Sequence, residues 1–176
     1  MWHEGEGKVT ANEFTSCILD FIRKNSTYKK IILVSDGCAY QNKNKILASA
    51  LADASSKFEI EIEQIILEKG HKRMEVDSVH STLERLFNPP IYTPAHYVSR
   101  MEAARNKKKG AHPYIINHLD HSFFKNFEGL PYNFASIRPG NKTGDPTVTD
   151  IRALLYRERE VSYKINHRDE WQLLPQ

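Results

Sequence analysis

The apolar and polar positions in the first half of the chain alternate between helical and strand spacing. The segment "TANE" (10–13) fits the S/T-x-x-E capping box, and the apolar residues after it recur every three or four positions, which predicts a helix over about 11–24. Ile31 to Val34 form a short continuous apolar run between polar turns, a pattern typical of a strand covered on both faces. Helical spacing then returns and predicts a second helix over about 43–56.

Asn42 or Asn44 is the candidate N-cap of the second helix. Two further elements follow this helix. The segment "FEIEIEQIIL" (58–67) alternates apolar and charged residues before it becomes wholly apolar, which predicts a strand that is half exposed at its start. Apolar residues from Val76 to Phe87 share one face of a third helix, which Pro89-Pro90 ends. The order helix, strand, helix, strand, helix predicts a mainly parallel sheet with helices on its faces.

The second half of the chain is less regular. Thr93-Pro94 predicts the start of a helix that ends near Gly110. The segment "TVTDIRALLYRE" is compatible with a helix or a strand, and three other segments are candidate strands: "PYIINHL", "NFASIRP" and "VSYKI". Because no repeat, low-complexity tract or linker interrupts the chain, we expect one compact unit, with a core over 1–90 and a C-terminal extension over 91–176 packed on the same domain.

Composition places the chain among soluble globular proteins, with no run near the roughly 20 apolar residues that a membrane span needs. The opening "MWHEGEGK" is polar, so we expect no secretory signal and an intracellular location, with the nucleus as a candidate compartment. Cys17 and Cys38 lie far apart without a second Cys at ligand spacing, which gives little support to a zinc ribbon or a disulfide framework.

The formal net charge of +3 is small for a nucleic-acid-binding chain of this length, but basic residues gather locally in the second half. They lie in "RMEAARNKKKG", "SIRPGNK" and "YRERE". A solvated surface has the same composition, so phosphate binding and simple solvation both stay open. The candidate contacts to DNA or RNA phosphates are Lys107, Lys108, Lys109, Arg138 and Lys142.

Acidic residues carry the candidate chemistry. Asp36 directly follows the predicted strand, and ligands and metal ions bind at the carboxyl ends of strands in open α/β sheets. Asp77, His80 and Glu84 are spaced i, i+3, i+7, so on a helix they form one stripe. If that helix packs against the strand of Asp36, these ligands converge on one or two divalent cations. Carboxylate-rich sites favour Mg²⁺ or Mn²⁺, which clamp phosphoryl oxygens and activate water.

Each of these acids also has a purely structural interpretation. Asp36 lies in a segment typical of a strand-ending turn. Glu13, a further candidate ligand at the start of the first helix, fits the capping box, and Asp77 fits a helix N-cap. Glu84 has a candidate partner in Arg85 or a surface lysine. His118 and His121 are close in sequence but would face opposite sides of a strand.

Four blocks of sequence indicate a family: "MWHEGEGKVTANEFTSCILDFI", "ILVSDGCAYQNKNK", "LEKGHKRMEVDSVHSTLER" and "IRPGNKTGDPTVTDIRALLY". In order and spacing the chain resembles uncharacterised transposon-derived proteins that are compared with the ribonuclease H-like superfamily of transposases and integrases. The resemblance covers nearly the whole chain and implies a ribonuclease H-like mixed sheet flanked by helices, with an irregular α+β C-terminal extension. Related proteins carry a strand or two upstream of "WHEG", so we expect a fold that lacks its N-terminal strands.

In that superfamily, acids from a first strand, the first helix, a central strand and a later helix hold two metal ions for strand cleavage or transfer. The resemblance implies that Asp36 is the central-strand acid, Asp77 the late-helix acid and Glu13 the first-helix acid. Glu13 or Glu84 would complete the metal shell, and His71 or His80 would orient water or phosphate. The ancestral activity is therefore metal-dependent phosphoryl transfer on nucleic acid.

Three present-day functions stay open, because function depends on the site and not on the fold. The first is a divalent-metal-dependent nuclease or transposase-like enzyme. The second is a catalytically inactive domain that binds DNA or RNA, and the third is a protein-interaction module.

Overall fold

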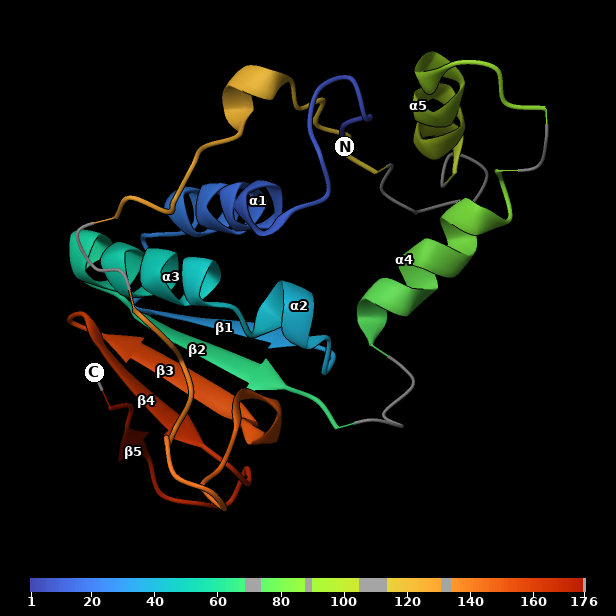
Figure 1. Cartoon of the computed structure of the whole chain (residues 1–176). Coiled ribbons are helices and arrows are strands. Elements are labelled where there is room, and N and C mark those ends of the chain that lie inside the picture. Colours follow the sequence, from blue (N-terminus) through green and yellow to red (C-terminus); the bar gives the residue numbers. More distant parts are fainter. Residues whose placement is uncertain (69–73, 88–89, 105–113, 131–133, 176) are drawn as a thin grey trace. The chain divides into compact units, whose positions relative to one another are not determined.

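The structure is a computed structural model that divides the chain into two compact units, each described here by itself (Figure 1). The first unit comprises Met1–Gly7 and Gly70–His121, and the second comprises Lys8–Lys69 and Ser122–Gln176. The residues described are 1–68, 74–87, 90–104, 114–130 and 134–175, without the side chains of 39 and 40.

The second unit contains a mixed sheet, which in the described residues has five strands in the order β1-β2-β3-β4-β5. Its strands are β1 (Lys30–Ser35), β2 (Glu61–Ile66), β3 (Ala153–Arg157), β4 (Glu160–Lys164) and β5 (Gln172–Leu173). β1 and β2 pair in parallel, whereas the later pairs are antiparallel. The prediction of a mainly parallel sheet was therefore wrong: only the strands joined by a crossover helix run parallel, and β4 follows β3 in a hairpin.

The helices of this unit, α1 (Ala11–Lys24) and α3 (Lys45–Phe58), lie over one face of the sheet (Figure 1). The short α2 (Ala39–Asn42) precedes α3. The predicted capping box of α1 is present, since Glu13 Oε2 accepts hydrogen bonds from the Thr10 backbone N–H and hydroxyl. At α3 the cap is Asn44, whose Oδ1 accepts from the Leu47 N–H at 2.9 Å.

One face of the sheet carries the core. Ile62, Gln64 and Ile66 of β2 are all buried, and α3 packs over β2 and β3 through Leu47 and Leu51. The face of the sheet that points away from α1 and α3 is called the open face here. On β1, β2 and β3 its side chains are Lys30, Ile32, Val34, Glu61, Glu63, Ile65, Ala153, Leu155 and Arg157, and on β4 they are Glu160, Ser162 and Lys164.

The prediction that β1 is covered on both faces was wrong. Ile31 is only 7% exposed, but Ile32 and Val34 on the open face are 52% and 54% exposed. A continuous apolar run is typical of a strand with two covered faces, yet the helices of this unit cover only one. β1 therefore presents apolar side chains to solvent.

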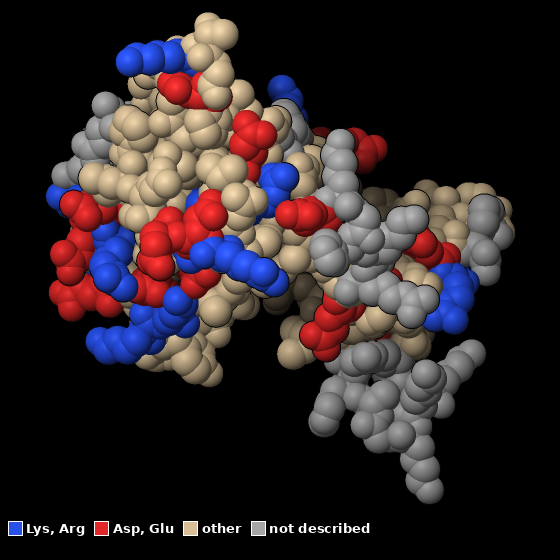
Figure 2. Space-filling model, turned by 90° about the horizontal axis from the view of Figure 1, so that it is seen from below, with Lys and Arg blue, Asp and Glu red and all other residues tan. Residues whose placement is uncertain are grey.

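The open face also carries charged side chains that pair with one another. Lys30 Nζ lies 2.7 Å from Glu61 Oε1 and 2.7 Å from Glu63 Oε2, and Arg157 also pairs with Glu61. The hydrogen bonds from Lys30 and then Arg157 lower the pKa of the Glu61 carboxyl. Acidic and basic side chains are correspondingly interleaved on the side of the molecule that Figure 2 shows.

In the second half of the chain, two predicted strands are absent from the described residues. Neither 114–119 nor 134–139 forms a strand, although Ile137 is buried in the core. The ambiguous segment 147–158 forms a 3₁₀ turn, η2 (Val148–Asp150), and then β3. "VSYKI" forms β4, as predicted. β1 and β2 precede residue 90 in the chain, whereas β3, β4 and β5 follow it, and all five belong to one sheet. A boundary at residue 90 therefore does not divide the chain into two structural units.

The first unit contains the helices α4 (Glu75–Glu84) and α5 (Pro94–Ala103). Phe87 and Tyr97 pack edge to face with ring centroids 5.0 Å apart, and the Arg100 guanidinium donates to the Leu86 carbonyl at 3.0 Å. The described α4 has no fully buried residue: on its predicted apolar face Val76 is exposed, and the other apolar side chains are only partly buried. A second 3₁₀ turn, η1 (His121–Phe123), lies at the boundary of the units.

Candidate cation site at the end of strand β1

Asp36 directly follows β1, and β1 and β2 end at the same edge of the sheet because they are parallel. The Asp36 side chain is exposed, and its Oδ1 accepts from the Cys38 N–H and from Asn42 Nδ2, both at 3.1 Å. The first of these bonds closes an Asx turn, which confirms the structural interpretation of this segment. The same two bonds hold the carboxylate in one orientation at the carboxyl end of a parallel pair.

A buried hydrogen-bonded network supports this turn from inside the core. Gln64, 2% exposed, donates from Nε2 to the Asn42 carbonyl at 2.5 Å, and the Tyr156 hydroxyl donates to Gln64 Oε1 at 3.2 Å. Burial raises the pKa of the Tyr156 phenol, so the hydroxyl keeps its proton as a donor. Tyr156, Gln64 and Asn42 thus link β3 and β2 to the carboxylate of Asp36.

The sequence reasoning missed Gln64. A signal was present, because Gln64 occupies the core-facing register of β2 between Ile62 and Ile66. A polar side chain at such a position needs partners inside the protein, and the distant Tyr156 and Asn42 supply them.

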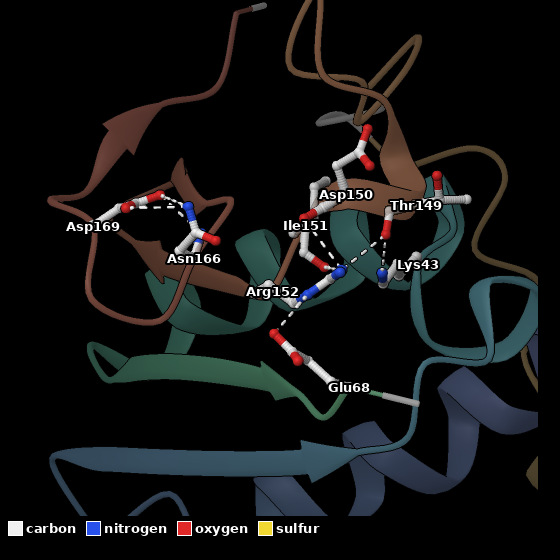
Figure 3. Close-up of polar contacts among 8 residues, drawn as sticks. All are labelled: Lys43, Glu68, Thr149, Asp150, Ile151, Arg152, Asn166 and Asp169. Atoms are coloured by element: carbon white, nitrogen blue, oxygen red, sulfur yellow. Dashed lines mark hydrogen bonds and ion pairs between the residues drawn. The ribbon is translucent and has the colours of Figure 1, made fainter. Parts of the chain in front are cut away.

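Two further missed residues, Lys43 and Arg152, are basic and meet at the Thr149 carbonyl (Figure 3). Lys43 is buried and its Nζ donates to Thr149 O at 3.0 Å, while Arg152 Nη1 donates to the same oxygen at 3.0 Å. Burial and then the charge of Arg152 lower the pKa of the Lys43 ammonium. Arg152 Nε also lies 3.6 Å from Glu68 Oε1, just beyond β2. These charges hold the η2 segment against the sheet.

Two of the other predicted acids, Glu13 and Asp77, serve as helix caps. Glu13 occupies position N3 of the α1 capping box; burial alone would raise the pKa of its carboxyl, but the hydrogen bonds from Thr10 lower it. Asp77 Oδ2 accepts from the Met74 N–H at 2.8 Å at the start of α4. The capping-box interpretation of Glu13 is therefore confirmed, whereas Asp77 caps α4 from position N3 and the N-cap residue is Met74. Metal binding by either acid stays a prediction.

The predicted ligands belong to different units. Asp36 and Glu13 lie in the second unit, whereas Asp77, His80 and Glu84 lie on α4 of the first, all three exposed. Their convergence therefore stays a prediction. Among the residues that the structure describes, no three His, Cys, Asp or Glu side chains form a group able to hold a metal ion.

Of the predicted phosphate contacts, only Arg138 and Lys142 are among the described residues. Arg138 and Lys142 lie in a loop of the second unit, with Lys142 exposed and Arg138 partly exposed. His71, Lys107, Lys108 and Lys109 lie outside the described residues.

None of the helices in the described part of the chain is both long enough and apolar enough to cross a membrane.

These observations define the class of protein: a mixed α/β protein with a supported acidic turn at the end of a parallel strand pair. Residues 4–105, more than half of the chain, match a family described as "Domain of unknown function (DUF8701)". The chain belongs to this family. Comparisons with curated proteins and with solved structures gave no match.

Proposed function

We propose that the chain is a ribonuclease H-like domain of transposase descent that performs metal-dependent phosphoryl transfer on nucleic acid, with Asp36 as its central-strand acid. The order of α1, β1, α3 and β2, with the two strands parallel, supports this proposal. The observation that carries it is the exposed Asp36 carboxylate at the carboxyl end of β1, oriented by two donors. None of the ion pairs found among the described residues involves Asp36.

The donor chemistry at this turn fits Mg²⁺ or Mn²⁺. Magnesium takes oxygen ligands and is commonly held by one or two carboxylates, with water and substrate phosphates completing its shell. Asp36 would hold the cation, with Asp77 and Glu13 or Glu84 as proposed further ligands and His80 as the residue that orients water. When bound, the cation would act as a Lewis acid on a phosphoryl oxygen. The chain itself orients Asp36 through Asn42.

The cation proposal is tested by thermal unfolding with increasing Mn²⁺. A ligand that binds only the folded state stabilises it by about 2.7 kcal/mol at 100 times its Kd, so we expect the Tm of the wild type to rise. Asp36→Asn should remove this rise, because the amide keeps an oxygen that accepts from the Cys38 N–H but loses the charge. Glu160→Gln, an exposed acid at the start of β4, is the matched control and should respond like the wild type.

An unchanged Tm in the wild type, or equal rises in wild type and Asp36→Asn, would contradict the cation proposal. Asp77→Asn gives a second result from the same titration. A weaker response in that variant would support Asp77 as a ligand of the cation, whereas a wild-type response would remove Asp77 from the proposed ligands.

The nucleic-acid proposal predicts that affinity for a short DNA or RNA duplex falls as salt is added, because neutralised phosphates release counterions. The double change Arg138→Gln, Lys142→Gln should weaken binding and reduce the salt slope by up to about two, since each phosphate contact contributes about one. Lys24→Gln with Lys57→Gln, two exposed bases elsewhere in the second unit, is the matched control. Salt-independent binding of the wild type would rule out phosphate recognition.

A second candidate function, a protein-interaction module, is favoured by a different observation. β1 is an edge strand of the described sheet and carries exposed apolar side chains.

A further inference from the structure

A cavity of about 630 Å³ lies in the second unit, between α1, α3 and the segment 122–130. The two helices pack against each other over the sheet and form two of its walls (Figure 1). Half of the lining residues are apolar, and the large ones are Leu19, Phe58, Phe123, Phe127 and Leu130. Cavities of about 300–1,000 Å³ that combine apolar walls with a few polar groups are typical of small-molecule sites.

The third wall of this cavity is fixed to α1 by hydrogen bonds. The Lys125 N–H donates to Ser16 Oγ at 3.0 Å, and the Phe127 N–H donates to Asn12 Oδ1 at 3.0 Å. Ser16 is only 5% exposed, and its hydroxyl donates in turn to the Asn12 carbonyl at 2.8 Å. The segment 122–130 is therefore held in place before any ligand arrives, which lowers the entropic cost of binding.

The cavity contains one carboxylate that lacks a basic partner. Asp20 is compensated, because its two oxygens lie 2.8 Å from Arg23 Nη2 and 2.6 Å from Lys24 Nζ. Asp53 of α3 is partly buried in the lining, and in the described part of the chain no hydrogen bond or ion pair reaches its carboxylate. A carboxylate beside apolar walls is costly unless a cation or a donor compensates it.

The same wall of the cavity presents an ammonium group. Lys57 follows Asp53 by four positions on α3, a spacing at which acidic and basic side chains commonly pair. Here no ion pair joins these two described side chains, and Lys57 Nζ lies instead over the Phe58 ring, 5.9 Å from its centroid. One face of α3 therefore directs two opposite charges at the cavity without pairing them.

We propose that this cavity binds a free α-amino acid with a large apolar side chain. The ligand ammonium pairs with Asp53 and the ligand carboxylate pairs with Lys57, both as charge-assisted hydrogen bonds. The ligand side chain packs against Phe123 and Phe127 of the third wall.

The charges of the lining favour this ligand over singly charged ones. A ligand with only a positive charge would lie near Lys57 and Lys125, which both line the cavity. A ligand with only a negative charge would lie near Asp53, and an uncharged one would leave Asp53 without a partner. An apolar amino acid supplies one charge of each sign beside an apolar body, so it complements every part of the lining.

The test is the affinity of the wild type for L-phenylalanine, measured by ligand-observed NMR titration and compared with three analogues. 2-Phenylethylamine lacks the carboxylate, 3-phenylpropionate lacks the ammonium, and glycine lacks the side chain. We expect each analogue to bind at least about tenfold more weakly, because it leaves one charged group unpaired or the apolar walls uncovered.

Two variants assign the charges of the ligand. Asp53→Asn should bind phenylalanine no better than 3-phenylpropionate, because the ammonium no longer gains a partner. Lys57→Gln should likewise bind phenylalanine no better than 2-phenylethylamine. The matched control is Lys45→Gln, an exposed lysine at the other end of α3 and outside the lining, which should bind like the wild type.

Absence of phenylalanine binding by the wild type would overturn the proposal. Equal affinity for 3-phenylpropionate would indicate an anion site, equal affinity for 2-phenylethylamine a cation site, and either result would also overturn it. The same holds if Lys45→Gln weakens binding as much as Lys57→Gln. The analogue series needs only the wild type, so it decides the question even if circular dichroism shows that a variant does not fold.

This cavity is separate from the proposed cation site, and the two proposals fail separately. Asp36→Asn should remove the Mn²⁺ response of Tm and leave phenylalanine binding unchanged. Asp53→Asn should weaken phenylalanine binding and leave the Mn²⁺ response intact.

Discussion

Truncation of Ile62 to alanine is expected to lower the free energy of unfolding of the second unit by about 3 kcal/mol. Ile62 is fully buried on β2, which lies between β1 and β3, and its side chain faces the helices. Removing three carbons from such a position loses their burial and leaves a cavity that the surrounding core fills only in part.

The matched control is Ile65→Ala, which makes the same chemical change on the same strand. Ile65 lies on the open face and is only partly buried, so we expect a loss of about 1 kcal/mol or less. Urea unfolding followed by the fluorescence of Trp171, in a Trp2→Phe background, measures the unit that contains the sheet. Equal losses from the two variants would mean that both faces of β2 are covered in solution.

The second large effect is expected at the buried network that supports Asp36. Tyr156→Phe removes the hydroxyl that donates to Gln64 Oε1 and leaves a buried carbonyl oxygen without that donor. An unsatisfied buried acceptor costs about 1–3 kcal/mol, and we expect the free energy of unfolding to fall by that amount. Urea unfolding in the same Trp2→Phe background is the measurement.

A neighbouring pair provides the control for this change. The Tyr163 hydroxyl donates to Gln172 Oε1 at 2.7 Å, but Gln172 is exposed and water can replace the lost donor. Tyr163→Phe should therefore cost about 0.5 kcal/mol or less. If both variants lost the same stability, burial of Gln64 would not be the source of the effect.

The helices were predictable because their signals are local. Thr10 and Asn44 are the N-cap residues of α1 and α3. The hydrogen bonds that cap each helix join residues only three positions apart in the chain. Thr93-Pro94 likewise marks the start of α5. Capping chemistry and apolar spacing both act within a few turns, so the sequence alone indicates these elements.

The sheet was predicted less well, because strand pairing joins distant segments. Nothing near 153–157 indicates that Leu154 pairs with Gln64, 90 positions earlier in the chain. The same limit explains the two absent strands: "NFASIRP" places Ile137 in the core, and burial of that side chain needs no strand pairing. Apolar composition predicted burial there and could not predict hydrogen bonding.

In the candidate site, too, the local feature was predicted and the long-range contacts were not. The position of Asp36 after a strand was predicted from adjacent residues and is confirmed. The support that it receives through Asn42, Gln64 and Tyr156 was not predicted, because those side chains meet only when β2, β3 and α2 come together.

The sequence by itself determined the helix starts, the strand at 30–35 and the acid that follows it, since short-range spacing and capping specify these features. The tertiary structure alone decided that the later strands join the sheet in antiparallel order and that only one face of β1 is covered. It also placed β1 at an edge of the sheet that the described residues form. The physical reason is that strand pairing and the burial of a strand's faces depend on which distant segments pack against it. The residues of the strand itself do not specify those segments.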